Sequence, residues 1–494
     1  MHAHVFDKIC HPTEKGVYQY FDGATWKESA SGKRIPIVSP IDESIVGYIP
    51  EVTTKEMDEV VTRAKKAQIT WNEIPLYERV KMMHLVADWL HHYKEHMTTM
   101  LVKEIGKTVS DAENEVERSA DLIDYYANDV IALHGETRES DSFPGVEKGK
   151  TAMIEYAPHG VVLCIAPFNY PLNLAVSKIV PALLMGNSVI FKPPTQGAIV
   201  GLFMTALFEI AGIKNGVLSC VTGSGSSVGA YLSAHTDIDM VAFTGSSAVG
   251  ESLARTIGMK PMLFECGGNN GVIVLPDANM GKTAEEIVKG AFSYSGQRCT
   301  GIKYIVAPAQ VMESLRPHII TAIKKLVVVG DPRDTKTKLV GPVISLAAAQ
   351  EIKQKIDSAI EKGATLLVGG TVEGNSVEAT VLDHVTMDMD IVKSETFGPV
   401  LSLVSVQSMQ EAIDIINHSA YGLQASIFSQ DEGAALHVAR KICVGTVQIN
   451  GSPQRGPDHF PFMGIKSSGV GVQGVRYALE AMARITSIVL NNPA

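Results

Sequence analysis

The sequence predicts an α/β protein built from more than one structural unit, and three observations support this fold class. The chain has 494 residues, 45% of them hydrophobic, which is enough for two or three packed cores. Residues 55–135 place apolar side chains at three- and four-residue spacing, as amphipathic helices do. From residue 160 onward, short β-rich runs alternate with helical stretches, which is typical of parallel sheets.

The elements follow from these patterns in chain order. Two helical stretches come first, KEMDEVVTRAKKAQITW and RVKMMHLVADWLHHYKEHM, with charges on the face opposite the apolar one. A first parallel sheet is then predicted from the runs GVVLCIA, NSVIFK, GVLSCVT, DMVAFT and GVIVL. After Cys299 a second α/β unit is predicted from the runs VGPVIS, ATLLVGG, GPVLSLVSV and VGTVQIN.

Composition excludes several classes of function. The formal net charge of −10 leaves no broad basic surface for nucleic acid. The most apolar region, 160–191, has too many interruptions for a membrane span, among them Asn169, Lys178 and Gly186. Six scattered cysteines without a CxxC pair predict neither a disulfide framework nor a metal site. The first residues, MHAHVFDKICHPTEKG, lack the order of a signal peptide, so we expect a cytoplasmic protein.

A candidate cofactor site lies on the first predicted sheet. The run VIFK ends at Lys192, and VAFTGSSAVGESLA passes from a strand through Gly245 into a helix that opens near Ser246. Backbone N–H groups and the helix dipole at such a start favour a pyrophosphate. The glycine spacing is not GxGxxG, so an ordinary strand-to-helix turn with a lysine at its rim remains the alternative.

Three further segments carry candidate catalytic residues. Asn169 stands on a stiff turn between prolines, where its amide could donate to an oxyanion or merely form the turn. Glu265 ends an apolar strand before two glycines, as a general base or as a charge at the sheet edge. Cys299 follows Arg298 in YSGQRCTG, where the thiol is either packed or reactive beside a positive charge.

Together the motifs PFNYP, FKPPTQG, FTGSSAVG, ECGG, GQRC and ETFGPV occur in the order in which the aldehyde dehydrogenase superfamily carries them. The chain resembles this family over nearly its whole length. The resemblance implies that Cys299 attacks the aldehyde and that Asn169 and the backbone N–H of Cys299 hold the oxyanion. It also implies that hydride leaves for a nicotinamide and that Glu265 activates the water that hydrolyses the thioester.

The same resemblance assigns residues to the cofactor. Lys192 should reach the adenosine ribose, Gly245 and Ser246 the pyrophosphate, and Glu395 with Phe397 the nicotinamide end. Many NAD-preferring relatives have a glutamate where this chain has Thr195. A threonine leaves room for a 2′-phosphate, so NADP is favoured and NAD is not excluded.

The substrate is expected to be a small anionic aldehyde. The chain is similar to the non-phosphorylating glyceraldehyde-3-phosphate dehydrogenases, and this resemblance implies that a phosphate is bound by four residues: Arg118, Tyr170, Arg298 and Arg455. Taken singly, each arginine is more often a structural ion-pair residue. 3-Sulfolactaldehyde and succinic semialdehyde remain alternatives. Acyl transfer to coenzyme A is disfavoured because such relatives lack the water-activating glutamate that stands here as Glu265. A non-enzymatic binding role is disfavoured because Cys299, Glu265 and Asn169 are all present.

The resemblance also implies a domain organisation. Residues 1–134 and 157–264 should form a Rossmann-type cofactor domain, and residues 265–468 an α/β catalytic domain. Segments 135–156 and 469–494 should form a small β oligomerisation domain. The C-terminal run EAMARITSIVL would expose a β edge in a monomer, so we expect a homodimer or homotetramer.

Overall fold

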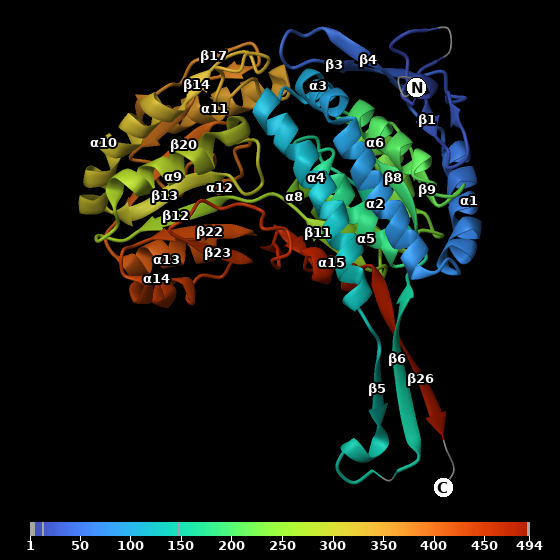
Figure 1. The fold of residues 1–494 in the computed structure, drawn as a ribbon. Helices are drawn as coiled ribbons and strands as arrows, with labels where there is room; N and C mark the ends of the chain where they lie inside the picture. Colours follow the sequence, from blue (N-terminus) through green and yellow to red (C-terminus); the bar gives the residue numbers. More distant parts are fainter. Residues whose placement is uncertain (1–4, 12–13, 147, 492–494) are drawn as a thin grey trace.

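The computed structural model describes residues 5–11, 14–146 and 148–491. Two α/β units lie side by side, and an arm of three strands projects below the first unit (Figure 1). The predicted α/β class is thereby confirmed. Within the described residues, no helix is both long and apolar enough to cross a membrane.

The first unit contains an eight-stranded sheet. Its order is β2 (Trp26–Lys27), β1 (Tyr20–Phe21), β9 (Leu218–Cys220), β8 (Ser188–Lys192), β7 (Val161–Ile165), β10 (Met240–Thr244), β11 (Met262–Glu265) and β25 (Gly469–Val470). The five strands from β9 to β11 are parallel, as the sequence predicts for this region. From β7 the chain adds β8 and β9 on one side and β10 and β11 on the other, so the strand order reverses between β7 and β10.

Helices cover both faces of this sheet because successive side chains of a strand point to opposite faces. In β7, Val162 and Cys164 belong to one hydrophobic cluster, and Val161 and Leu163 to the other. The first cluster is completed by α2 (Leu76–His92), α3 (Lys94–Ile105), α4 (Val109–Asp129), α5 (Asn173–Leu184), α6 (Ala198–Ile210) and α15 (Val475–Ala481). The second is completed by α1 (Thr54–Asn72), α7 (Ala230–Ala234) and α8 (Ser247–Thr256).

The second unit contains a seven-stranded sheet. Its order is β16 (Thr365–Val368), β19 (Thr380–Asp383), β20 (Val400–Val406), β13 (Ile302–Pro308), β12 (Asn270–Val274), β22 (Gln424–Phe428) and β23 (Thr446–Ile449). All its pairs are parallel except β16 with β19. The helices on its faces are α9 (Met280–Phe292), α10 (Ala309–Leu326), α11 (Leu346–Glu361), α12 (Asp390–Lys393), α13 (Met409–His418) and α14 (Glu432–Ala439).

Two strand predictions are wrong. GVIVL forms β12, which lies in the second sheet and not in the first. Only Cys266–Asn269 separates β11 from β12, and a parallel crossover within one sheet needs about a dozen residues or more. VGPVIS is mostly irregular: β15 (Leu339–Val340) pairs only with β14 (Val328–Val329), because Pro342 interrupts the run.

The arm is a three-stranded antiparallel sheet in the order β26 (Ala483–Asn491), β6 (Lys150–Pro158) and β5 (Glu136–Glu139). Residues 469–482 lie outside it, because β25 pairs with β11 and α15 packs into the first unit. The proposed division into domains stays a prediction. Smaller two-stranded sheets pair β3 (Arg34–Val38) with β4 (Ile45–Pro50), β17 (Val372–Glu373) with β18 (Ser376–Val377), and β21 (Tyr421–Gly422) with β24 (Ile465–Lys466).

Candidate active site

The candidate site lies where the strand order of the first sheet reverses. Strand register aligns Ile165 with Lys192 on one side and with Phe243 on the other, and aligns Thr244 with Glu265. These residues therefore stand together at the carboxyl ends of the parallel strands. Such reversals create the crevice in which open α/β sheets bind ligands.

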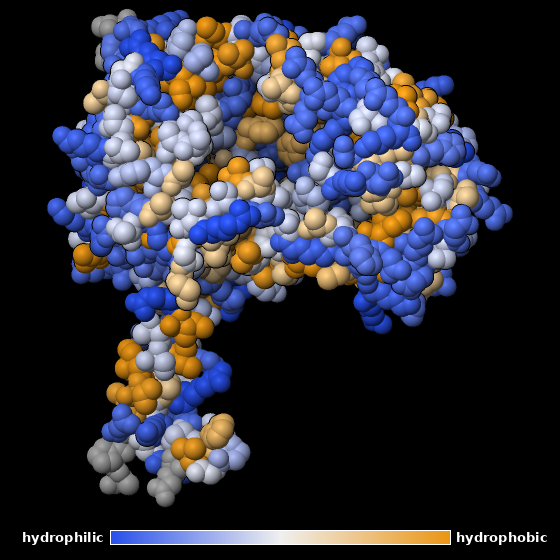
Figure 2. Space-filling view, turned by 180° about the vertical axis from the view of Figure 1, so that it is seen from behind, coloured by the Kyte–Doolittle hydropathy of each residue, from blue (hydrophilic) through white to orange (hydrophobic). Residues whose placement is uncertain are grey.

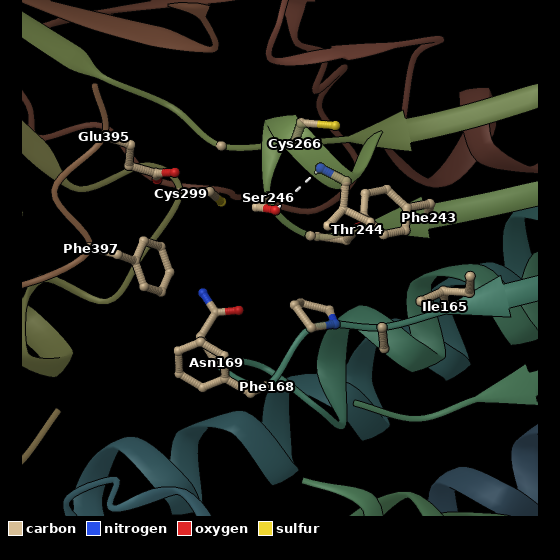
Figure 3. A pocket seen from close by; sticks show the side chains of 15 residues that line it. Ile165, Phe168, Asn169, Phe243, Thr244, Ser246, Cys266, Cys299, Glu395 and Phe397 are labelled. Carbon is tan, nitrogen blue, oxygen red and sulfur yellow. Dashed lines mark hydrogen bonds between the residues drawn. The ribbon is translucent and has the colours of Figure 1, made fainter. Parts of the chain in front are cut away.

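A cavity of about 450 Å³ occupies this crevice (Figure 3). Side chains from both units face each other across it: Ser246, Thr244 and Asn169 from the first, Cys299, Glu395 and Phe397 from the second. Its full lining is Ile165, Ala166, Pro167, Phe168, Asn169, Phe243, Thr244, Gly245, Ser246, Val249, Cys266, Gly267, Cys299, Glu395 and Phe397. The fold thus brings residues far apart in sequence to one hollow.

The loop that carries Cys299 has an unusual backbone. It follows the 3₁₀ turn η5 (Ser293–Gly296), in which Tyr294 and Ser295 have φ values of 50° and 53°. Residues other than glycine seldom adopt this left-handed conformation, because it costs about 1–3 kcal/mol for each residue. The Tyr294 hydroxyl donates to the Ile105 carbonyl at 3.2 Å, and Ser295 Oγ donates to the Gly341 carbonyl at 2.8 Å. These contacts hold the turn before Cys299 in one conformation.

Two asparagines fix the position of this loop. Asn169 Nδ2 donates to the Gln297 carbonyl at 2.9 Å, and Asn270 Nδ2 donates to the Cys299 carbonyl at 2.8 Å. An amide nitrogen carries two hydrogens, so Asn169 retains a donor for a substrate oxygen. Its amide group faces the cavity (Figure 3). Asn169 thus has a free donor at the cavity, and its role as oxyanion ligand stays a prediction. Asn270 ties the loop to the second sheet, because its Oδ1 accepts from Gln424 N at 3.0 Å.

The surroundings of the Cys299 thiol favour its protonated form. Burial raises its pKa well above the ordinary value, and the nearby carboxylates of Glu265 and Glu395 raise it further. Arg455 and Arg298 act in the opposite direction but do not outweigh these effects. Arg298 thus favours the thiolate of Cys299, as expected, but its effect on the pKa is smaller than that of burial.

Alkylation should report this protonation state. Without cofactor, iodoacetamide should modify Cys299 slowly at pH 7 and about tenfold faster per pH unit up to pH 9, because the thiolate is the reactive form. Peptide mass spectrometry over time measures the rate. The exposed Cys443 in the same digest is the internal control. Fast modification of Cys299 at pH 6 would contradict the high pKa.

Glu265 ends β11 beside Cys299, and its side chain is 1% exposed. Its Oε1 lies 3.6 Å from Cys299 Sγ. Its Oε2 accepts a hydrogen bond from Arg455 Nη1 at 2.6 Å and one from Thr244 Oγ1 at 3.4 Å. Cys299, Glu265 and Arg455, which are the predicted nucleophile, base and anion ligand, therefore contact one another in a row.

Of the four residues predicted to bind the substrate anion, Arg118 and Arg455 share one carboxylate, that of Asp458. Arg118 donates to both oxygens of Asp458, at 2.7 and 2.8 Å, and Arg455 Nε lies 3.6 Å from the same carboxylate. Burial raises the pKa of Tyr170 to about 12, and Arg298 and Arg118 both oppose this shift, which places Tyr170 near two of the arginines. Their contact with a substrate stays a prediction.

Arg298 precedes Cys299 on the same loop and makes its hydrogen bonds to backbone carbonyls. Its Nη2 donates to the carbonyls of Gly290 and Pro453, both at 3.2 Å. Its Nε is buried and has no hydrogen-bond partner among the described residues. A buried donor without a partner is costly, and an anionic ligand is one group that would satisfy it.

Four of the six residues predicted to bind the cofactor line the cavity: Gly245, Ser246, Glu395 and Phe397. Ser246 caps α8, with its Oγ accepting from Val249 N at 3.4 Å (Figure 3). A side chain at Gly245 would meet the Phe243 ring at 2.5 Å. Burial raises the pKa of Glu395 to about 7.

Lys192 and Thr195 lie outside the cavity lining. Lys192 ends β8 and is buried, which lowers its pKa to about 8, and Thr195 Oγ1 donates to the Gly223 carbonyl at 3.3 Å. The carboxylate of Glu104 accepts from the backbone N–H groups of residues 197, 199 and 200, at 2.9 Å each. This buried carboxylate fixes the loop that carries Thr195.

Sequence patterns did not point to several residues that build the site. Lys178 seemed only to interrupt an apolar run, yet it is fully buried. Burial lowers its pKa to about 8, and the nearby charge of Glu265 acts in the opposite direction. Lys107 and Glu115 form a buried ion pair, and Lys107 Nζ lies 3.6 Å from the Tyr170 ring centroid. For Lys178 the available signal was a charged residue inside an otherwise apolar helix, α5. Within the described residues, no cluster of metal-ligating side chains occurs.

Comparison with known proteins gives the family. The model of the aldehyde dehydrogenase family matches residues 26–488. The chain is 41% identical over 480 residues to the NADP-dependent glyceraldehyde-3-phosphate dehydrogenase of Pisum sativum, covering 97% of this chain and 96% of that protein. It is 34% identical over 454 residues to the sulfoacetaldehyde dehydrogenase of Neptuniibacter caesariensis, covering 92% and 99%.

A solved structure agrees with this result. The NADP-dependent glyceraldehyde-3-phosphate dehydrogenase from Bacillus halodurans C-125, complexed with NADP, is 43% identical, with a TM-score of 0.94 and coverage of 96% of this chain and 99% of that chain. Matching sequence and fold leave one conclusion: the chain belongs to the aldehyde dehydrogenase family.

Proposed function

We propose that this aldehyde dehydrogenase oxidises glyceraldehyde 3-phosphate to 3-phosphoglycerate with NADP. The observation that carries the proposal is the row in which Cys299, Glu265 and Arg455 lie in contact, 3.6 and 2.6 Å apart. A nucleophile, a carboxylate for water and a buried guanidinium suit an aldehyde with an anionic end. The names of the relatives in Pisum sativum and Bacillus halodurans support the same substrate.

The chemistry follows from the positions of the chain's own residues. The Cys299 thiol gives its proton to Glu265 Oε1, 3.6 Å away, and Glu265 later releases this proton to solvent. The sulfur attacks the aldehyde carbon, and Asn169 Nδ2 stabilises the oxygen that becomes negative. After oxidation the acyl group is bound to Cys299 as a thioester. Glu265 then takes a proton from water, the hydroxyl adds to the carbonyl carbon, and the C–S bond breaks to release the acid. NADP, when bound, would supply the hydride acceptor.

The residues around the cavity fit this cofactor. The start of α8 at Ser246 offers backbone N–H groups to the pyrophosphate, and the Oγ of Ser247 is buried without a partner among the described residues. Glu395 and Phe397 would contact the nicotinamide end. Thr195 presents no carboxylate to a 2′-phosphate, so NADP should be used in preference to NAD.

A substrate panel tests the proposal. Purified protein is assayed by absorbance of the reduced cofactor with glyceraldehyde 3-phosphate, 3-sulfolactaldehyde and succinic semialdehyde, each with NADP and with NAD. The highest kcat/KM is expected for glyceraldehyde 3-phosphate with NADP. 3-Sulfolactaldehyde is included because a sulfonate is also an anion and because a more distant relative, 34% identical, is a sulfoacetaldehyde dehydrogenase. A preference for a sulfonate or carboxylate would reject phosphate as the recognised group.

Arg118 offers a test of anion recognition. The Arg118→Gln variant should lose a charge-assisted contact of about 1.5–3 kcal/mol, which is roughly a ten- to hundredfold loss of kcat/KM for glyceraldehyde 3-phosphate. Uncharged glyceraldehyde never makes this contact and should be much less affected. Arg333→Gln, an exposed arginine paired with Asp331 and Asp42, is the matched control. Equal losses for both aldehydes would assign Arg118 a structural role only.

The arm supports a further proposal, that the protein is a homodimer or homotetramer. Apolar side chains gather along the projecting strands (Figure 2), and Ile485 in β26 is 70% exposed. An exposed apolar strand is stabilised by pairing with another chain. Light scattering after gel filtration measures the mass. A cytoplasmic location also stays a proposal, and the six free cysteines fit a reducing compartment.

A further inference from the structure

Arg455 is engaged by two carboxylates before any substrate arrives. Its Nη1 contacts Glu265 at 2.6 Å, and its Nε lies 3.6 Å from Asp458. Its Nη2 donates to Gln473 Oε1 at 2.9 Å. The side chain is 11% exposed, so these contacts are shielded from solvent. The guanidinium that should bind the substrate anion is therefore already bound to the proposed base.

Glu265 is held on both of its oxygens in this state. Oε2 accepts from Arg455 and Thr244, and Oε1 accepts from the Cys299 thiol. A water that attacks the thioester must be aligned by the same carboxylate. The contact with Arg455 directs Oε2 away from that task, so the resting arrangement is not the one that hydrolysis requires.

A substrate phosphate would change the balance of charges here. The group carries close to two negative charges, and a guanidinium binds it in the same forked way as it binds a carboxylate. An anion on Arg455 would compete with Glu265 for the same N–H group and would repel its carboxylate. A hollow of about 300 Å³ adjoins Arg455 and Asp458, which gives the guanidinium room to move.

From these contacts we propose that the anionic end of the substrate takes Arg455 from Glu265 and so frees the carboxylate to activate water. The inference rests on the proposed function, because it needs an anionic aldehyde. Binding and catalysis are then linked through Arg455. The anion would raise the rate of thioester hydrolysis and would not only tighten binding, which is how remote binding energy serves a chemical step.

The test supplies the substrate in two parts. Glycolaldehyde, which has no anion, is oxidised with saturating NADP in the presence and absence of phosphite dianion. Reduced-cofactor absorbance after rapid mixing gives the acylation rate, and the mass of acid-quenched protein follows loss of the acyl group from Cys299. Phosphite should accelerate loss of the acyl group at least tenfold in the wild-type enzyme. No acceleration, or acceleration of acylation alone, overturns the inference.

Variants assign the effect to Arg455. The ratio to compare is the rate of acyl-group loss with phosphite divided by the rate without it. In Arg455→Gln this ratio should be near one, whatever the rate of the variant without phosphite. Arg455→Lys keeps the charge but not the fork, so a reduced ratio is expected there, and it replaces the glutamine variant if that protein does not fold. Arg118→Gln should need more phosphite to reach the same ratio. A full ratio in both Arg455 variants overturns the inference.

These outcomes are separate from those of the substrate panel. If glyceraldehyde 3-phosphate is not the preferred aldehyde, the proposed function fails. If it is preferred and phosphite leaves hydrolysis of the acyl group unchanged, the proposed function stands and only the release of Glu265 is wrong.

Discussion

Replacing Cys299 with serine should abolish aldehyde oxidation, lowering kcat by roughly a thousandfold or more. Serine keeps the shape of the loop, which is fixed by the Asn270 contact to the carbonyl of residue 299. A hydroxyl is far less acidic than a thiol, so the neighbouring carboxylate of Glu265 is too weak a base to make it a comparable nucleophile. Steady-state absorbance of reduced cofactor measures the loss, and calorimetry should find unchanged binding of NADP.

Cys266 provides the matched control for this variant. Its side chain lines the same cavity and belongs to the hydrophobic cluster on one face of the first sheet, so we expect it to serve packing. Cys266→Ser should keep most of the activity. Substantial turnover by Cys299→Ser, or an equal loss in both variants, would remove Cys299 from its assigned role.

Replacing Glu265 with glutamine should separate the two halves of the reaction. One equivalent of reduced cofactor per active site should form in a burst, because oxidation precedes the attack of water. The steady state should then fall by roughly a hundred- to a thousandfold, since a general base is lost. Stopped-flow absorbance resolves the burst, and mass spectrometry should find the acyl group on Cys299.

Glu313→Gln, at an exposed position of α10, is the control for a change of charge alone. It should behave as the wild type. A Glu265→Gln enzyme with an unaltered steady state and no burst would mean that another group activates water. Lys178 would be a candidate, because its buried amine lies close enough to Glu265 to respond to its charge.

Much of the first unit could be predicted because its information is local. The runs ending at Lys192, Thr244 and Glu265 are short, apolar and followed by turn residues, and parallel strands bring such ends to one edge. The prediction for GVIVL places it in the wrong sheet, although the length of the connection between β11 and β12 decides which sheet it joins. Four residues cannot form a parallel crossover, so the strand had to begin another sheet.

The sequence alone therefore determined the α/β class, the candidate nucleophile Cys299 and the strand-to-helix start at Ser246, because each depends on neighbours along the chain. Only the tertiary structure decided what Arg455 does. Its partner Glu265 stands 190 residues away, and the pair forms because both charges are buried at one point. A charge removed from water must find an opposite charge nearby, and packing decides which one it finds.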